Sequence, residues 1–369
     1  MREEAEDLPA ALTRRMLVSK KASLFDVLGK LTPISARLSL DLRKVMRDTE
    51  DWNDSVSPML RERWVENFLL LEQLRGIKFS RARLPEDAIS ADMDLIIAGD
   101  TAKEFVKICG VWARFKLKNG SFSNQHLIGR SLLGDDDSSI PKEELESLAM
   151  CSNLGWIVRQ MLEKWVRDYI VISDSTISLC WVISEKKKLS LFHRNRSVQV
   201  RRGTDLDKLF HCRSEYNPCD LGTRTTSVSV SDVGPQSSWE LGLPWMTQSV
   251  EDAVKVGILK PAKELTLSEE ETEDYHRGFV YEKSNEILTK GHIALHSKAG
   301  EKIQERREFS NYVIDPLKFS FDKTVRVLSI VYRFIKSFKC VRGKLSPAGR
   351  KFQMLPVLIA EKFTEEGAT

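Results

Sequence analysis

The sequence lacks the features of a membrane-embedded or secreted chain. None of its apolar runs approaches the ~20 residues that span a bilayer, and the stretch MREEAEDLPA at its start has no apolar signal core. The six cysteines are scattered and form no CxxC pair, so they indicate neither a disulfide framework nor a zinc ribbon. We therefore expect a chain that works in a reducing, intracellular compartment, away from membranes.

The composition leaves the function open but bounds the architecture. Hydrophobic residues make up 41% and charged residues 30% of the chain, as in ordinary globular proteins. A length of 369 residues allows two or three domains, each able to bury a core. The net charge of +4 is too small to indicate a partner by itself. The distribution of residues along the chain is more informative.

The first segment, residues 1–88, is predicted to be a small helical module. Apolar residues recur at helical spacing in two stretches. They are Leu38, Leu42, Val45 and Met46 in the first, and Leu60, Trp64, Phe68 and Leu71 in the second. The polar stretch TEDWNDSVSP separates them and indicates a turn.

Residues 89–226 change to short β-like runs followed by helical patterns. The strand-like runs are MDLIIA, VKICGVWARFKL, SFSNQHLIGR, YIVIS and KLFHC, and the signal Lys118-Asn119-Gly120 predicts a hairpin between the second and third. Helices are predicted from Pro141 to Trp165, over STISLCWVI, and after Asn217-Pro218. This order predicts an α/β fold, with a mixed five-stranded sheet and helices packed on its faces.

The last segment, residues 227–369, has weaker periodicity. The Gly-, Pro- and Ser-rich stretch VSVSDVGPQSSWELGLPW is expected to be extended, and the acidic run LTLSEEETED to be exposed. One amphipathic helix is predicted from Asp322 to Lys339. This segment is interpreted as a mixed, irregular spacer with a helix.

Four acidic residues stand where the predicted sheet would open a crevice. Asp100 and Asp174 follow apolar strands, Glu144 lies in the first turn of the long helix, and Asp220 opens the last helix. Four carboxylates can meet at one point only if cations lie between them, and hard oxygen ligands suit magnesium. Two such ions clamp the attacking water and the leaving oxygen of a phosphodiester. The alternative is that each acid is a solvated surface residue, and Glu143 and Glu146 compete with Glu144 on the same helix.

Several motifs lie at these residues. They are GDTA at 99–102, SIPKEELESLA at 139–149, ISDSTISLCWV at 172–182 and HCRSEYNPCDLGTR at 211–224, preceded by KKASLFDVLGKLTPISARLSLDLRKV at 20–45, DW at 51–52 and RERW at 61–64. Over most of its length the chain resembles the polyprotein of Bel/Pao long-terminal-repeat retrotransposons, a region also named after a Pao retrotransposon peptidase. The family more often has Ala-Ser where this sequence has Thr101-Ala102.

The resemblance implies a division into three parts of a Pol polyprotein. Residues 1–88 correspond to the connection segment of a reverse transcriptase, 89–226 to a ribonuclease H domain, and 227–369 to a spacer toward an integrase. His292 and His296 are not followed by a CxxC pair, so an integrase zinc site is not expected. The implied location is a cytoplasmic virus-like particle or the nucleus.

The resemblance also implies the activity, which is hydrolysis of the RNA strand of an RNA:DNA hybrid. Asp100, Glu144, Asp174 and Asp220 would hold two Mg²⁺ or Mn²⁺ ions, and His211 would position or release product. The hybrid and the polymerase and integrase parts of the same polyprotein are the implied partners. The alternative for His211 is an ordinary hydrogen-bonded strand residue.

A basic stretch without acids lies between the STISLCWVI helix and the KLFHC strand. Its members are Lys186, Lys187, Lys188, Arg194, Arg196, Arg201 and Arg202. Such a stretch beside the acids is predicted to bind the phosphate backbone of the hybrid. The alternative is a solvated helix face.

Two other functions compete with the nuclease. An aspartic peptidase is suggested by LIIAGDTA and HLIGRSLLG, but only residues 101–125 separate the two, too few for the flap hairpin of such an enzyme. A catalytically silent or domesticated fragment would keep the fold and bind nucleic acid or a partner. The presence of all four acids argues against the silent fragment.

Overall fold

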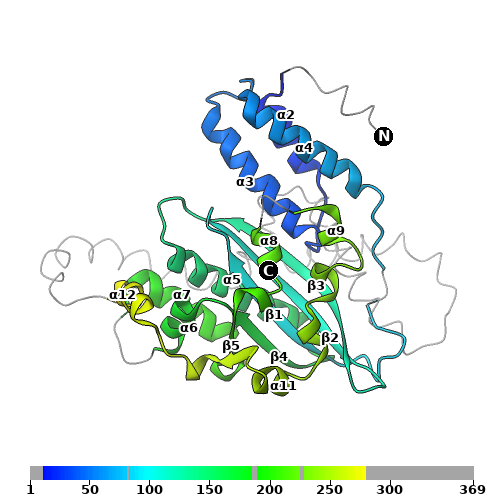
Figure 1. Ribbon diagram of the computed structural model, residues 1–369, viewed down its shortest axis with the longest axis vertical. Helices are drawn as coiled ribbons and strands as arrows, with labels where there is room; N and C mark the ends of the chain where they lie inside the picture. The colour runs from blue at the N-terminus through cyan, green and yellow to red at the C-terminus, as the bar shows by residue number, and fades with distance from the viewer. Residues whose placement is uncertain (1–10, 81–82, 185–188, 225–227, 280–369) are drawn as a thin grey trace, which may run out of the picture. The chain divides into compact units, whose positions relative to one another are not determined.

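The core of the protein is a mixed six-stranded sheet, described in a computed structural model (Figure 1). The structure describes residues 11–80, 83–184, 189–224 and 228–279. The strands are β1 (Met93–Thr101), β2 (Val106–Lys116), β3 (Phe122–Leu133), β4 (Val166–Ser173), β5 (Leu209–Cys212) and β6 (Leu259–Pro261). Their order across the sheet is β3-β2-β1-β4-β5-β6. The predicted α/β class and the mixed sheet are confirmed.

The pairing explains why the acids at the strand ends lie near one another. β1 pairs antiparallel with β2 and parallel with β4, and β4 pairs parallel with β5. β1 and β4 therefore end at the same edge of the sheet, where the chain leaves toward helices. Their apolar runs are buried on both sides, because helices cover both faces of the sheet.

One expectation about the sheet is wrong. The sheet has six strands and not five, because Leu259–Pro261, which we assigned to the spacer, pairs antiparallel with β5. A strand of three residues is too short to show the alternation by which strands are found in a sequence. The sheet therefore includes residues beyond the predicted boundary at residue 226.

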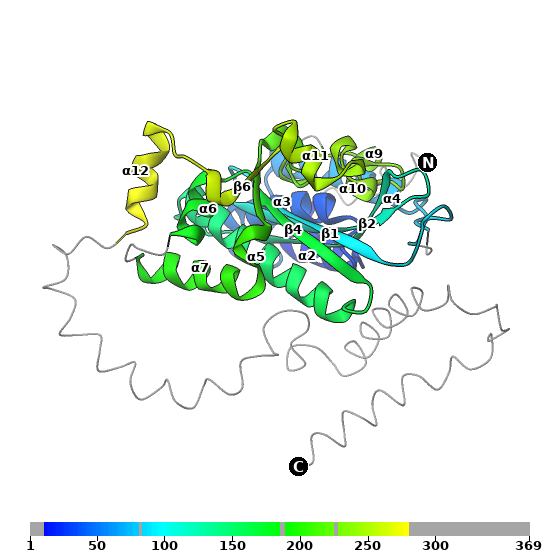
Figure 2. The same ribbon diagram turned by 90° about the horizontal axis from the view of Figure 1, so that it is seen from below.

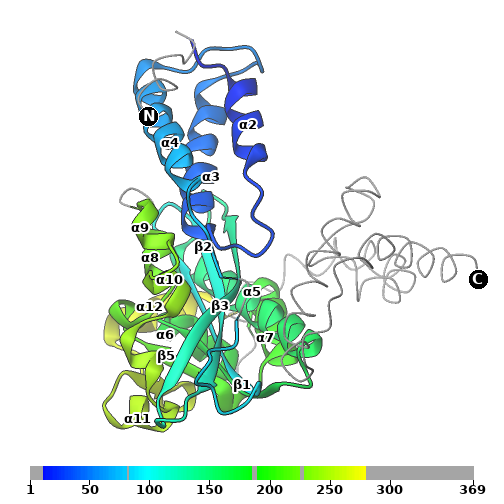
Figure 3. The ribbon, with the colours of Figure 1, turned by 90° about the vertical axis from the view of Figure 1, so that its right-hand side faces the viewer.

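The helices cover the two faces of the sheet. They are α2 (Arg14–Ser23), α3 (Thr32–Asp48), α4 (Pro58–Leu74), α5 (Ile140–Met161), α6 (Thr176–Ile183), α7 (Leu191–Gly203), α8 (Asp220–Thr223), α9 (Val230–Val233), α10 (Ser238–Leu241), α11 (Val250–Lys255) and α12 (Glu269–Arg277). Short 3₁₀ helices are η1 (Leu206–Lys208), η2 (Ser214–Tyr216), η3 (Pro244–Thr247) and η4 (Ala262–Glu264). Figures 2 and 3 show α5 and α7 on one face of the strands and α8, α9 and α10 on the other. Among the described residues, no helix combines the length and apolarity that crossing a membrane requires.

The N-terminal helices share one core with the sheet. Buried side chains of α3 and α4 cluster with those of β1, β2 and β4. Arg37 Nε donates to Asn67 Oδ1 at 2.8 Å, and Asn67 Nδ2 donates to Asp41 Oδ2 at 2.8 Å. Arg37 Nη1 also donates to the backbone oxygen of Val228 at 3.2 Å. Helices α2, α3 and α4 lie within the predicted segment 1–88, and the core they form continues beyond residue 88 into the sheet.

Residues 228–264 also pack on the sheet and do not form an extended spacer. Trp112 on β2 donates its indole N–H to the backbone oxygen of Trp239 at 2.9 Å, and the two rings meet edge to face. Lys30 Nζ and Glu240 Oε2 form a buried ion pair at 2.5 Å. The amphipathic helix predicted from Asp322 to Lys339, and His292 and His296, lie outside the described residues.

Candidate active site

Three of the predicted acids are brought to one edge of the sheet by three different elements. Asp100 is the penultimate residue of β1, and Asp174 directly follows β4. Glu144 is the fifth residue of α5, so it lies in the second turn and not the first as we expected. Gly99 allows α5 to approach β1, because a Cβ there would lie 2.1 Å from Cys151 Sγ on α5. The close packing of this helix on this strand brings Glu144 toward the strand ends.

Each of the three carboxylates accepts a hydrogen bond from a hydroxyl group of another part of the chain. Thr223 Oγ1 donates to Asp100 Oδ2 at 2.6 Å. Ser175 Oγ donates to Glu144 Oε2 at 2.5 Å, and Ser214 Oγ donates to Asp174 Oδ2 at 2.7 Å. A hydroxyl donor orients a carboxylate without neutralising its charge.

The pKa values of all three acids are raised, first by burial and, for Asp100 and Glu144, also by neighbouring carboxylates. Burial, followed by the charge of Asp174, raises the pKa of Asp100 to about 7. Burial also raises the pKa of Glu144 to about 7, and the charges of Asp174 and Asp100 act in the same direction. Burial raises the pKa of Asp174 as well. Asp100 and Glu144 therefore lie with Asp174 in a partly dry site, where burial and the neighbouring like charges both disfavour ionisation.

Asp220 lies at the margin of this group. It is the first residue of α8 and forms an ion pair with Arg224. Its charge contributes to the raised pKa of Asp100, which indicates that the two carboxylates are near neighbours. Among the described ion pairs, Asp220 is the one of the four predicted acids that has a Lys or Arg partner.

The donor chemistry of the site fits a divalent cation. Within the described parts of the chain, no three His, Cys, Asp or Glu side chains have the close spacing of a formed metal site. Asp100, Glu144 and Asp174 nevertheless form a set of hard oxygen donors with uncompensated charge, since no ion pair to any of them is present among the described residues. A divalent cation between them would remove the repulsion that raises their pKa values.

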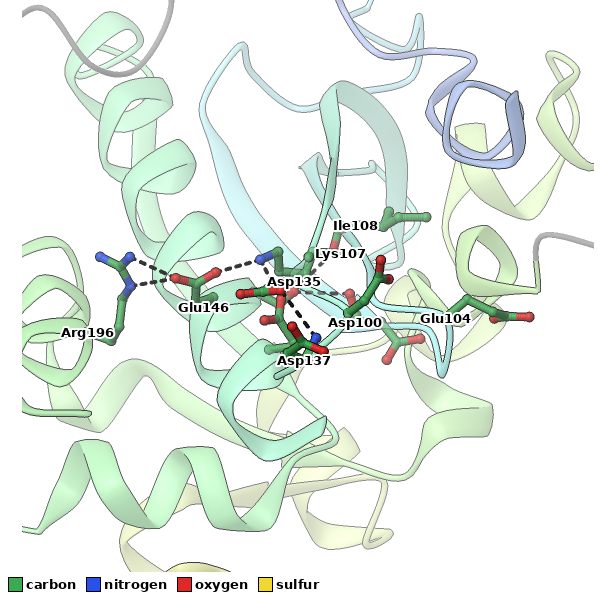
Figure 4. Close-up of polar contacts among 12 residues, drawn as sticks. Asp100, Glu104, Lys107, Ile108, Asp135, Asp137, Glu146 and Arg196 are labelled. Atoms are coloured by element: carbon green, nitrogen blue, oxygen red, sulfur yellow. Dashed lines mark hydrogen bonds and ion pairs between the residues drawn. The ribbon is translucent and has the colours of Figure 1, made fainter. Parts of the chain in front are cut away.

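The neighbouring glutamates on α5 have protein partners. Lys107 Nζ lies 2.6 Å from Glu143 Oε2 and 2.5 Å from Glu146 Oε2. Arg196 Nη2 lies 2.7 Å from Glu146 Oε1. Figure 4 shows Glu146 between Lys107 and Arg196. Among the described residues, Glu143 and Glu146 thus form ion pairs, whereas Glu144 accepts a hydrogen bond from Ser175 and faces the other acids, so Glu144 remains our prediction for the ligand-binding glutamate.

His211 lies on β5 next to the acids. Its Nε2 is 3.2 Å from the backbone oxygen of Asp174, and burial lowers its pKa. The pairing of β5 with β4 places His211 opposite Ser173. The location agrees with a role beside the acids, although the hydrogen bond it makes is to backbone.

Two kinds of residue near the site were missed in the sequence. The hydroxyl donors Ser175, Ser214 and Thr223 lie inside the quoted motifs, one or three residues from an acid or histidine, and this spacing is the signal by which the sequence could have indicated them. Glu271 on α12 contributes to raising the pKa of Glu144, although its acidic stretch was expected to be only exposed. Its approach to the site depends on the chain folding back after β6, which no local pattern indicates.

Only some of the basic residues predicted to bind phosphate are exposed and described in the structure. Lys186, Lys187 and Lys188 lie outside the described residues. The arginines lie on α7, a helix that we did not predict. Arg196 pairs with Glu146, and Arg201 donates to the backbone oxygens of Val182 and Ser184 at 2.6 and 2.9 Å. Arg194 and Arg202 are exposed.

Comparison with known families agrees with the architecture. Residues 13–175 match the family model of the Pao retrotransposon-like RNaseH-like domain. The matched range includes α2 to α4 together with Asp100, Glu144 and Asp174, and it ends before His211 and Asp220. No curated protein and no solved structure matches the chain.

Proposed function

We propose that this chain, whose residues 13–175 are a Bel/Pao retrotransposon RNase H-like region, hydrolyses the RNA strand of RNA:DNA hybrids. The family assignment supports a nuclease-like function in general. The observation that carries the more specific proposal is the group of Asp100, Glu144 and Asp174, three buried carboxylates from three elements whose pKa values are all raised and that form no ion pair with Lys or Arg among the described residues.

Asp100, Glu144, Asp174 and Asp220 are the residues that would hold two Mg²⁺ or Mn²⁺ ions. When bound, such ions supply an activated water and stabilise the departing 3′ oxygen of a phosphodiester. The chain's own contribution is orientation. Thr223, Ser175 and Ser214 hold carboxylate oxygens in fixed directions, and the backbone oxygen of Asp174 fixes the ring of His211 beside the site.

The peptidase alternative gains no support from the fold. GDTA spans the end of β1, which is hydrogen-bonded to β2 on one side and β4 on the other. HLIGRSLLG, residues 126–134, includes the second half of β3, the strand beyond β2, so the two sequences are separated by an intervening strand. In a peptidase Asp100→Asn would remove proteolysis while Glu144→Gln left it unchanged.

The proposal is tested with Asp174→Asn on a hybrid labelled separately in each strand. The wild-type chain is expected to cut only the RNA strand with Mg²⁺ or Mn²⁺, and the variant to lose about 10²- to 10³-fold in rate. The matched control is Asp168→Asn, the same change at an exposed position of the same strand, which pairs with Lys208. It should cut at the wild-type rate.

Three results would reject the nuclease. They are cleavage of neither strand by the wild-type chain, equal cleavage by Asp174→Asn, and cleavage that persists in excess EDTA. A chain that binds the hybrid with and without metal and cuts nothing would instead be a binding module.

A further inference from the structure

A surface pocket lies next to the acidic site. Its volume is about 460 Å³, within the range of about 300–1,000 Å³ typical of small-ligand pockets. Tyr216, Leu243, Pro244, Trp245 and Ile258 form its apolar part. Thr247 and Gln248 add polar groups to the lining. An aromatic wall with a few hydrogen-bonding groups matches the surface of a nucleobase, which has an apolar face and a polar edge.

The pocket is connected to the site through η2. Ser214, the first residue of η2, donates to Asp174, and Tyr216, the last, lines the pocket. Two residues span at most about 7 Å of chain. Trp245 donates its indole N–H to the backbone oxygen of Tyr216 at 3.0 Å, so η3 holds η2 in place. A strand whose phosphate lies at Asp174 therefore has the pocket as an immediate neighbour.

Cations flank the path between them. The guanidinium of Arg213 lies 5.3 Å from the centre of the Tyr216 ring, and its side chain is 65% exposed. Lys260 on β6 is exposed and lies opposite His211 in the sheet. Glu215, which also lines the pocket, pairs with Arg213 at 3.1 Å and compensates its charge, so Lys260 supplies the net positive charge on this path. Positive charge along the path suits a phosphate backbone that passes from the site to the pocket.

We infer that this pocket binds one unpaired base of the strand that enters the acidic site. A paired base inside a hybrid is stacked and cannot reach a side pocket, so the occupant is a nucleotide beyond the end of the duplex. The inference rests on the proposed function, because it assigns the neighbouring acids to a nucleic-acid strand. If an unpaired base binds in the pocket, the chain binds hybrids that carry a single-stranded extension on one side more tightly than blunt hybrids.

The experiment measures binding and not cleavage. The full chain is titrated in EDTA, so that nothing is cut, onto a blunt hybrid and onto hybrids with an unpaired adenosine tail at the 3′ or the 5′ end of the RNA strand. Stacking of one base lowers Kd by about tenfold. Because the pocket lies on one side of Asp174, only one of the two tails is expected to give this gain.

Variants separate stacking from general attraction. Tyr216→Ala should reduce the ratio of blunt to tailed Kd to about one. Phe25→Ala removes an aromatic ring that is 66% exposed and does not line the pocket, and it should keep the wild-type ratio. Gln248→Ala should reduce the ratio less than Tyr216→Ala, because it removes a polar contact and leaves the stacking surface.

The outcomes distinguish the two proposals. Equal Kd for blunt and tailed hybrids, equal gains from both tails, or a gain that survives Tyr216→Ala would overturn the pocket assignment. A chain that shows the one-sided gain and cuts no RNA with metal would refute the nuclease and keep the pocket. A chain that cuts RNA and ignores tails would refute the pocket and keep the nuclease.

Discussion

Helix α5 carries two kinds of glutamate within one turn. Glu143 and Glu146 lie against Lys107, and Glu146 also meets Arg196, so their charges are compensated by the protein. Glu144, between them in the sequence, meets a serine hydroxyl and faces Asp100 and Asp174. One side of the helix has the composition of a structural ion-pair network. The other side has an excess of negative charge.

The difference separates what stabilises the fold from what serves a ligand. A buried carboxylate with a cation and hydrogen bonds costs little net free energy, whereas one without a cation shifts its pKa or destabilises the fold. The glutamates one residue before and two residues after Glu144 in the sequence both have cation partners. Local conflict of this kind, beside a network that is fully paired, is expected at a functional site.

The largest expected effect comes from removing Lys107, the cation that pairs with Glu143 and Glu146 on α5. Lys107→Met removes the ion-pair partner of the buried Glu143, since the side chains of Lys107 and Glu143 are only 6% and 4% exposed. Removing one partner of a buried ion pair costs about 3–5 kcal/mol. We expect that loss in the free energy of unfolding, measured by urea denaturation at pH 7.

Two further variants make this measurement specific. Lys116→Met is the same change at an exposed position of β2 and should lie within about 0.5 kcal/mol of wild type. Adding Glu143→Gln to Lys107→Met should recover much of the loss, because no buried charge then lacks a partner at that position. A loss in Lys107→Met no greater than in Lys116→Met would contradict the contrast between the two sides of α5.

The sequence predicts the sheet well where its signals are local. MDLIIA, YIVIS and the hairpin at residues 118–120 are strong patterns, and they correspond to β1, β4 and the β2–β3 turn. β6 was missed because three residues give no alternation. α7 was not predicted because its sequence is mostly polar and basic and gives a weak apolar pattern. The residues that it buries, His193 and Val200, do lie at helical spacing.

The candidate site, like the sheet, could be predicted from the sequence only where the signal is local. Strand ends and motif order are sufficient to locate Asp100, Glu144 and Asp174 on their elements. The partners of those acids depend on contacts between distant parts of the chain, such as Thr223 with Asp100, which lie 123 residues apart. Local sequence likewise gave no means to choose Glu144 over Glu143, because the choice depends on where Lys107 of β2 lies.

A smaller effect should appear when pH changes the ionisation of Asp100 and Glu144, the carboxylates that face the candidate site. The folded chain holds the pKa of Asp100 and Glu144 at about 7, against ordinary values of 3.8 and 4.5. Between pH 5 and pH 7 the folded state therefore binds more protons than the unfolded chain, and stability falls as pH rises. We expect the Tm of the metal-free chain to fall by several degrees from pH 5 to pH 8 in calorimetry.

The same measurement checks the cause. Asp100→Asn should show a shallower fall and a higher Tm at pH 8 than wild type, because it removes a carboxylate that ionises at a cost. Millimolar Mn²⁺ at pH 8 should raise the Tm of wild type more than that of the variant, since a ligand of the folded state stabilises it. A wild-type Tm that rises from pH 5 to pH 8, or an equal Mn²⁺ effect on both chains, would contradict the assignment of these acids.

The smallest expected effect concerns the cations of α7, where the same distinction between paired and available charge applies. Arg194 and Arg202 are exposed, whereas Arg196 is engaged with Glu146. If α7 faces the hybrid, the double change Arg194→Gln and Arg202→Gln should reduce the slope of log affinity against log salt by about one to two, because each phosphate contact contributes about −0.9 on B-DNA. Arg196→Gln should leave this slope unchanged and cost less than about 1 kcal/mol of stability, since the pair with Glu146 is partly exposed.

The slope is measured in EDTA on a blunt hybrid, where the pocket beside Asp174 has no unpaired base to bind. An unchanged slope in the double variant would assign hybrid binding to another face, and a reduced slope in Arg196→Gln would mean that its ion pair opens to meet phosphate.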